Sequence, residues 1–62
     1  MKVREIIKLI ENDGWILYRQ KGSHKIYKHP YKKGIVVVPD HGLNSDVKKG
    51  TENSILKQAG LK

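Results

Sequence analysis

Apolar residues in the N-terminal segment recur at the interval of one helical turn. They are Val3, Ile6, Ile7 and Ile10, with charged or polar residues at most of the remaining positions. This spacing produces the apolar stripe of an amphipathic helix. Gly14 follows and suits the left-handed conformation that often comes after a last helical turn. The pattern predicts a helix over residues 2–12.

The middle of the chain changes to short runs of β-branched and aromatic residues, which are typical of strands. Strands are predicted over residues 15–21, 24–29 and 35–38. Gly22 and Ser23 separate the first two runs, and a two-residue loop with glycine first is typical of a type II′ hairpin turn. Pro30 and Pro39 end the later strands, because proline has no N–H to donate to a sheet ladder.

The C-terminal segment predicts a second helix after a polar connector at residues 40–50, which has no clear period. Thr51 is expected to cap this helix, with its hydroxyl accepting a free backbone N–H. The apolar side consists of Ile55, Leu56 and Ala59. Gly60 is placed for a left-handed cap, and Leu61 can fold back on Leu56 as in a Schellman motif.

The order of these elements defines the expected fold class. It is α+β, with the order α-β-β-β-α, a three-stranded antiparallel sheet and two helices on one face. That arrangement buries both apolar helix stripes at once. With 62 residues, the chain forms a single domain over residues 1–62 with a thin core.

Charge narrows the classes of partner. Thirteen Lys and Arg residues against six Asp and Glu give a formal net charge of +7. Such a surface attracts nucleic acid, an acidic protein or an anionic membrane. No basic amphipathic helix with a bulky aromatic face is present, which argues against a membrane partner. Many basic proteins are merely soluble, so charge alone leaves the partner open.

Cysteine usage and the N-terminus bear on compartment. The chain has no cysteine, so it has neither a disulfide framework nor a thiolate metal site. The longest apolar run, "IVVVP", is far too short to span a bilayer. The N-terminal residues carry acids and lack a small-residue cleavage site, unlike a secretory signal. We therefore expect a cytoplasmic protein.

Three histidines are candidates for chemistry. His24 is fixed beside the tight turn and flanked by Lys21 and Lys25, a setting that suits proton transfer, although an ordinary surface histidine is the simpler interpretation. A position at a strand end explains His29 without function, whereas His41 lies in a connector, where functional residues are common. His24 and His29 are five apart on a strand and face opposite sides, so no metal site is predicted.

Lysines and tyrosines extend the candidate site. Lys48 and Lys49 precede the last helix, where free amides and the helix dipole favour a phosphate group. A solvated charge run explains the same lysines equally well. The aromatic residues are mostly expected in the sheet or core, although Tyr27 or Tyr31 could stack on an unpaired base.

Three stretches together resemble a known family. They are "GWILYRQKGSHKIYKHP", "VVVPDH" and "KKGTENSILKQAGL", which cover nearly the whole chain. The G-S-H after the first strand, followed by G-T and S-I-L-K-Q-A-G-L, resembles the HicA family of toxin mRNA interferases. The resemblance implies a fold like a double-stranded-RNA-binding domain and cleavage of RNA without the ribosome. It also implies a partner, the HicB-type antitoxin.

The resemblance also assigns roles to individual residues. The histidine of the G-S-H motif is the family's catalytic residue and corresponds to His24, flanked by Gly22 and Ser23. The second recurrent histidine of the family corresponds to His41, as a second catalytic or binding group. The sequence departs from the family pattern at Glu52 and in the connector, which leaves open the path of residues 42–50.

The resulting hypothesis is a metal-independent endoribonuclease that uses His24 and no cofactor. Its expected substrate-binding residues are Lys21, Gly22, Ser23, Lys25, Lys48 and Lys49. The alternatives are a non-catalytic module that binds RNA, and a basic protein that acts only through a protein partner. We expect a monomer in isolation, although an edge strand is open to pairing, and a higher-order complex with the antitoxin.

Overall fold

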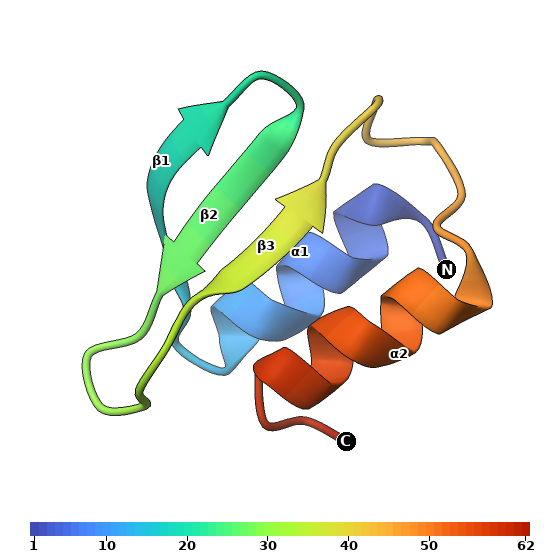
Figure 1. Cartoon of the computed structure of the whole chain (residues 1–62). Coiled ribbons are helices and arrows are strands. Elements are labelled where there is room, and N and C mark those ends of the chain that lie inside the picture. The colour runs from blue at the N-terminus through green and yellow to red at the C-terminus, as the bar shows by residue number, and fades with distance from the viewer.

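The computed structural model describes all 62 residues and has the expected order of elements. The elements are α1 (Val3–Asn12), β1 (Ile16–Lys21), β2 (His24–Lys28), β3 (Val36–Pro39) and α2 (Lys49–Gln58) (Figure 1). The α+β fold class and the α-β-β-β-α order are confirmed. Each boundary lies within a residue or two of its prediction.

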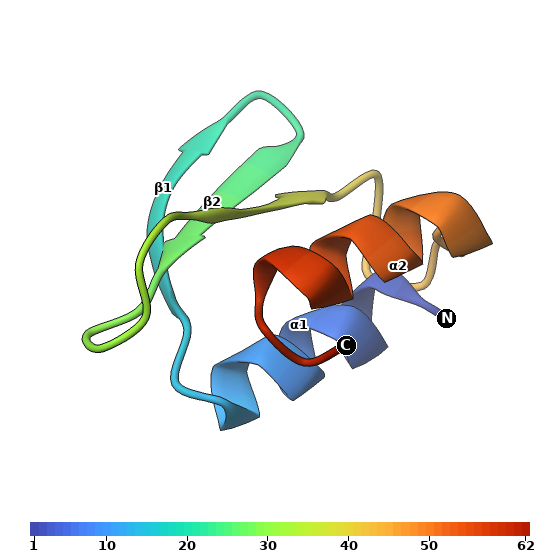
Figure 2. The same ribbon diagram turned by 60° about the horizontal axis from the view of Figure 1, so that its bottom comes forward.

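The molecule has two layers. The sheet is antiparallel with the order β1-β2-β3, so β2 is hydrogen-bonded on both sides. Both helices lie on one face of this sheet, and the other face is open (Figure 2). The core between the layers consists of nine buried residues: Val3, Ile6, Ile10, Trp15, Tyr27, Val36, Val38, Ile55 and Ala59.

Alternation along β2 and β3 decides which side chains reach that core. Tyr27 pairs with Val36, and both are buried beneath the helices. Because successive side chains on a strand point to opposite faces, Ile26 and its partner Val37 point outward. The sheet is therefore covered on one face only.

The hairpin between β1 and β2 has the predicted turn geometry. Gly22 has a φ of 59°, and no residue other than glycine has a positive φ. A type I′ turn would need positive φ at Ser23 as well, so the turn is of type II′. It places Lys21 directly opposite His24. Further from the turn, the register shifts at Tyr18, which forms a β-bulge in β1.

The prediction that Thr51 caps α2 is wrong. The helix begins at Lys49, and Lys48 precedes it with no side-chain cap, so Thr51 lies inside the first turn. The connector sets this earlier start, because the Val47 amide donates to the Met1 carbonyl oxygen at 2.9 Å and holds the chain just before the helix. In place of a side-chain cap, Glu52 in the first turn of α2 forms an ion pair with the N-terminal ammonium, at 3.0 Å.

The other end of α2 confirms the predicted Schellman motif. Gly60 has a φ of 74°, as a left-handed cap requires. The Leu61 amide donates to the Leu56 carbonyl oxygen at 2.8 Å, and the Gly60 amide donates to that of Lys57 at 3.0 Å. These are the two hydrogen bonds that define the motif.

The connector that had no readable pattern satisfies the free amides of α1. The first N–H groups of any helix lack partners within the helix. Here Val3 donates to the Ser45 carbonyl oxygen and Arg4 donates to that of Leu43, each at 3.0 Å. The connector is thus fixed by backbone hydrogen bonds, although its sequence has no helical or strand periodicity.

His29 holds together the end of β2 and the end of α1. Its Nδ1 accepts the amides of Tyr31 and Lys32 at 3.0 and 3.2 Å, so the ring proton is on Nε2, which donates to the Asp13 carbonyl oxygen at 2.6 Å. The ring also packs edge-on against Trp15, with centroids 5.2 Å apart. These contacts give His29 a structural role at the end of β2, as its position in the sequence indicated.

Gly14 and Lys32 complete this junction. A Cβ at Gly14 would lie 2.7 Å from Nε2 of His29, so only glycine fits there. Lys32 Nζ pairs with the Asp13 carboxylate and donates to the Ala59 carbonyl oxygen at 3.0 Å. The end of α1, the β2–β3 loop and the end of α2 are therefore joined at one place.

We predict that His29→Ala lowers the free energy of unfolding by about 2 kcal/mol, because two backbone amides and one carbonyl oxygen lose their partner. His29→Gln should be less damaging, since its amide nitrogen can replace Nε2 as a donor. Urea denaturation followed by circular dichroism measures both. A midpoint for His29→Ala equal to that of the unaltered protein would contradict this role.

Candidate functional site

His24 is exposed and free of partners. It is the first residue of β2, opposite Lys21 on β1 and Pro39 on β3. Its ring makes no hydrogen bond and no ion pair within the protein. Since backbone pairing on both sides fixes its Cα, the imidazole is well placed and open to a ligand.

Lys21 lies beside His24. Directly opposed residues of an antiparallel pair point to the same face, so the two side chains are neighbours on the open face of the sheet. Lys21 is exposed and has no carboxylate partner. Around Gly22 the space is open, because a Cβ built there meets no atom within 4 Å. The Ser23 carbonyl oxygen accepts the Asp40 amide at 2.6 Å, which ties the turn to the end of β3.

Lys25 points away from His24. It pairs with the buried Val38, so its side chain lies on the helix-facing side of the sheet. There Lys25 Nζ forms an ion pair with Asp40 at 2.8 Å, and the same carboxylate accepts the Gly42 amide at 2.8 Å. The hydrogen bond from Lys25, followed by that from Gly42, lowers the pKa of Asp40 below its ordinary value. The positive charge of Lys25 is therefore neutralised within the protein.

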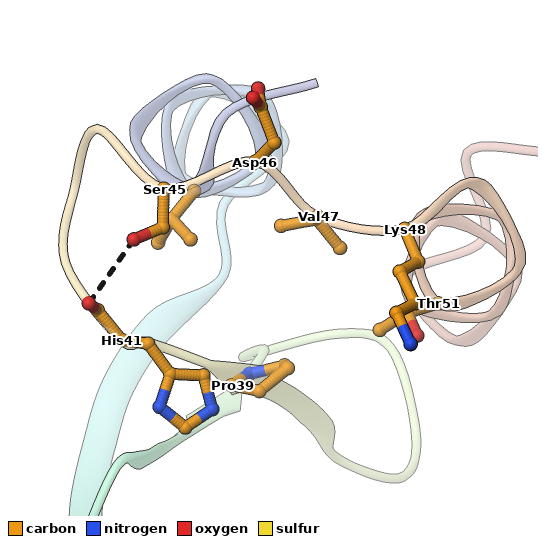
Figure 3. A pocket seen from close by; sticks show the side chains of 8 residues that line it. Pro39, His41, Ser45, Asp46, Val47, Lys48 and Thr51 are labelled. Atoms are coloured by element: carbon orange, nitrogen blue, oxygen red, sulfur yellow. Dashed lines mark hydrogen bonds between the residues drawn. The ribbon is translucent and has the colours of Figure 1, made fainter.

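His41 lies at the rim of a cavity of about 270 Å³ between the end of β3, the connector and the start of α2. Figure 3 shows the His41 ring and Pro39 on one side, with Lys48 and Thr51 opposite them. Ser45 Oγ donates to the His41 carbonyl oxygen at 3.1 Å and thereby orders this stretch of the connector. The Asp46 carboxylate points away from the His41 ring (Figure 3).

The predicted site residues thus fall into separate groups. His24 and Lys21 share the open face of the sheet, whereas His41 and Lys48 line the cavity. Lys49 is exposed on the first turn of α2 and does not line the cavity. The turn at Gly22 and Ser23 links the two groups, because the Ser23 carbonyl oxygen accepts a hydrogen bond from the amide of Asp40, which precedes His41.

Other residues on the open face were not predicted as site residues. They are Tyr18, Arg19 and Lys28, all exposed. Side-chain alternation along β1 and β2 could have indicated that these residues share a face with His24. The bulge at Tyr18 breaks that alternation, and the sequence does not predict the bulge. Tyr27, which was a candidate for stacking, is buried and unavailable.

Two further observations concern ligands and membranes. No group of three or more His, Cys, Asp or Glu side chains is arranged to hold a metal ion. Neither α1 nor α2 has the length and hydropathy that a bilayer crossing requires.

Comparison with known proteins agrees with this architecture. A profile of the family described as "HicA toxin of bacterial toxin-antitoxin" matches residues 3–61. A chain in a solved structure described as a toxin-antitoxin complex from Streptococcus pneumoniae is 35% identical, with a TM-score of 0.77 and 98% of each chain covered. No curated protein matches significantly.

The shared fold and the extent of both matches place the chain among the toxin components of bacterial toxin–antitoxin systems. It belongs to the HicA toxin family, and the resemblance found in the sequence is confirmed.

The Lys25–Asp40 pair makes stability depend on pH. Because the pKa of Asp40 is lowered in the folded state, as is that of Asp13 beside Lys32, folding favours the ionised carboxylates. Stability should therefore be complete above the ordinary aspartate pKa of about 4 and fall as the pH drops through the lowered values. Asp40→Asn should weaken this dependence.

Urea unfolding of both proteins at several pH values from about 7 down to 2 measures the difference. The part of the dependence that Asp13 contributes should persist in Asp40→Asn. Identical pH profiles for the two proteins would show that the ion pair contributes nothing.

Proposed function

We propose that this HicA-family toxin is a metal-independent endoribonuclease that cleaves mRNA without the ribosome and uses His24 as its acid–base group. The observation that carries the proposal is an exposed, unpartnered imidazole, fixed by backbone pairing beside an unpaired lysine. The family relationship supports the same activity. Substrate RNA is polyanionic, which suits a chain of net charge +7.

The reaction we propose is an internal transfer at phosphorus. The ribose 2′-oxygen attacks the adjacent phosphate, so that an O2′–P bond forms and the P–O5′ bond breaks. His24 takes the 2′-hydroxyl proton, or in the other assignment delivers a proton to the departing 5′-oxygen. The products are a 2′,3′-cyclic phosphate end and a 5′-hydroxyl end. The attacking hydroxyl belongs to the substrate, so no water nucleophile has to be generated.

Lys21 stabilises the negative charge that builds on the phosphate oxygens. It is the cation nearest to His24 in the strand register and has no competing carboxylate. Lys25 supports the site indirectly, by holding Asp40 and the end of β3 in place. His41 and Lys48, at the cavity beyond the turn, bind the RNA on that side, with Lys49 as a further cation. The second acid–base group is His41, a lysine or water.

The antitoxin partner and cellular setting complete the proposal. The solved relative is described as part of a toxin-antitoxin complex. We propose that a HicB-type antitoxin binds this chain through acidic residues that cover the cationic hairpin and block access to His24. The free toxin is then a cytoplasmic monomer, and a higher-order complex forms only with the antitoxin.

A non-catalytic RNA-binding module is the second candidate. Its fold class recognises duplex RNA by shape and by phosphate contacts, including lysines at a helix N-terminus. Lys48 and Lys49 at the start of α2 fit that description. Pure binding does not require the free imidazole of His24, so the two functions differ in the effect of its removal.

We expect His24→Ala to lower RNA cleavage by about 100-fold or more, because a general acid or base is lost. The assay uses purified protein and unstructured RNA in EDTA, with cyclic-phosphate ends identified by mass spectrometry. The ring of His24 makes no intramolecular bond, so the variant should unfold at the same urea concentration as the unaltered toxin. His41→Ala is the matched histidine variant and tests the second group.

Full activity in His24→Ala, or a requirement for added Mg²⁺, would overturn the proposed mechanism. Intact RNA with salt-sensitive retention on duplex would favour the binding module instead. A selective loss in His24→Ala with cyclic-phosphate products in EDTA supports the nuclease.

A further inference from the structure

The face of the sheet that no helix covers also carries the proposed catalytic residue. We call this the outer sheet face and define it by Tyr18, Arg19, Lys21, His24, Ile26 and Lys28. The pairs Lys21–His24 and Arg19–Ile26 share this face by their register, opposite to the buried Tyr27. Figure 2 shows the sheet with both helices on its other side.

The charge on the outer sheet face is of one sign. All six acidic residues lie outside the three strands, namely Glu5, Glu11, Asp13, Asp40, Asp46 and Glu52. The ion pairs of the protein involve only the N-terminus, Lys25 and Lys32 as cations. Arg19, Lys21 and Lys28 are therefore exposed cations without carboxylate partners. Such a surface suits the phosphates of a nucleic acid.

An aromatic ring stands at the end of this face away from the turn. Tyr18, in the β1 bulge, is 59% exposed, and Lys28 Nζ lies 4.1 Å from the centroid of its ring. A hollow of about 270 Å³ beside them is lined by Ile16, Leu17, Tyr18, Lys28, His29 and Pro30. Ile16 is itself 62% exposed. An accessible aromatic ring beside a cation and apolar walls is what an unpaired base requires for stacking.

We infer that the outer sheet face is the docking surface for unpaired RNA, with one base stacked on Tyr18 and phosphates held by Arg19 and Lys21 on the way to His24. This inference rests on the proposed nuclease function and specifies its substrate as single-stranded. His24 and Lys28 are four residues apart on β2, about 13 Å along the strand, which a few nucleotides can span. In duplex RNA the bases are stacked inside the helix and do not reach such a ring.

Binding of a single-stranded oligoribonucleotide with 2′-O-methyl groups tests this surface, because such RNA cannot be cleaved and the chemistry of His24 has no influence. Fluorescence anisotropy gives the dissociation constant. Tyr18→Ala should weaken binding by about 5- to 150-fold, the loss that removal of one base–aromatic stack produces. Tyr18→Phe keeps the ring and should bind within about twofold of the unaltered toxin. Both variants should fold, since the ring is largely exposed.

The salt dependence tests the phosphate contacts. Arg19→Gln should reduce the slope of log K against log salt by about 0.7, the value for one phosphate contact with a single strand. Lys8→Gln removes the same charge from α1 in the helix layer and serves as the matched control. It should leave the slope and the affinity for the single strand close to those of the unaltered toxin.

Single-strand affinity that is unchanged in Tyr18→Ala, or lowered equally by Lys8→Gln, overturns the inference. In that case the outer sheet face is free to serve as a surface for a protein partner. An equal loss of duplex and single-strand binding in Tyr18→Ala also overturns it. Because the probe cannot be cleaved, a toxin with Tyr18-dependent binding but no activity would refute the nuclease and leave the docking surface standing.

Discussion

One-sided burial is the constraint on which this molecule is built. A chain of 62 residues has two short helices to offer, and together they cover a single face of a three-stranded sheet. Nine buried residues form the whole core, and each contributing position on β2 and β3 alternates with one that points to solvent. The uncovered face is thus a consequence of size, because a domain this small has no further element to form a third layer on that side of the sheet. The residues proposed to act on RNA, His24 and Lys21, lie on the surface that this core leaves open.

The register of the hairpin places the candidate site residues on this uncovered face. Because the side-chain period of a strand is two, a slip of one residue would move His24 beneath the helices and bring Lys25 outward. Gly22 at positive φ fixes the two-residue turn and hence the pairing of Lys21 with His24. The Lys25–Asp40 ion pair and the bond from Asp40 to the Ser23 carbonyl oxygen reinforce the same register from the other face. The same contacts therefore stabilise the hairpin and hold the imidazole of His24 on the outer sheet face.

The sequence predicted the fold well where local rules act alone. The helical stripe of Val3 to Ile10, the turn at Gly22 and the Schellman motif at Gly60 each depend on residues close in the chain. The predicted start of α2 is wrong because a backbone hydrogen bond between Val47 and Met1 sets where the helix begins. Residues so far apart in sequence give no local signal of such a contact. The connector was unreadable for the same reason.

The candidate site was predictable to a similar extent. The two-residue turn indicates that Lys21 and His24 are opposite each other. That Lys25 lies on the other side of the sheet from them, paired with Asp40, depends on which face the helices cover, and the sequence does not indicate this. Tyr18 is expected in the sheet or core because aromatic residues favour strands, and it does lie in the sheet, but β1 is an edge strand whose residues are all exposed. The bonding of His29 to two amides of the next loop shows why its position at a strand end needs no catalytic explanation.

The strand order also separates two mechanical environments within the site. His24 is on β2, which is held by ladder bonds from both neighbours, whereas Tyr18 and Arg19 are on β1, whose outer edge has none and whose residues are all exposed. Local opening is easiest where backbone bonds are solvent-exposed and few apolar contacts oppose it. In the docking proposed for RNA, β1 can thus adjust to bases of different size while β2 holds the imidazole of His24, the proposed acid–base group, in a fixed position.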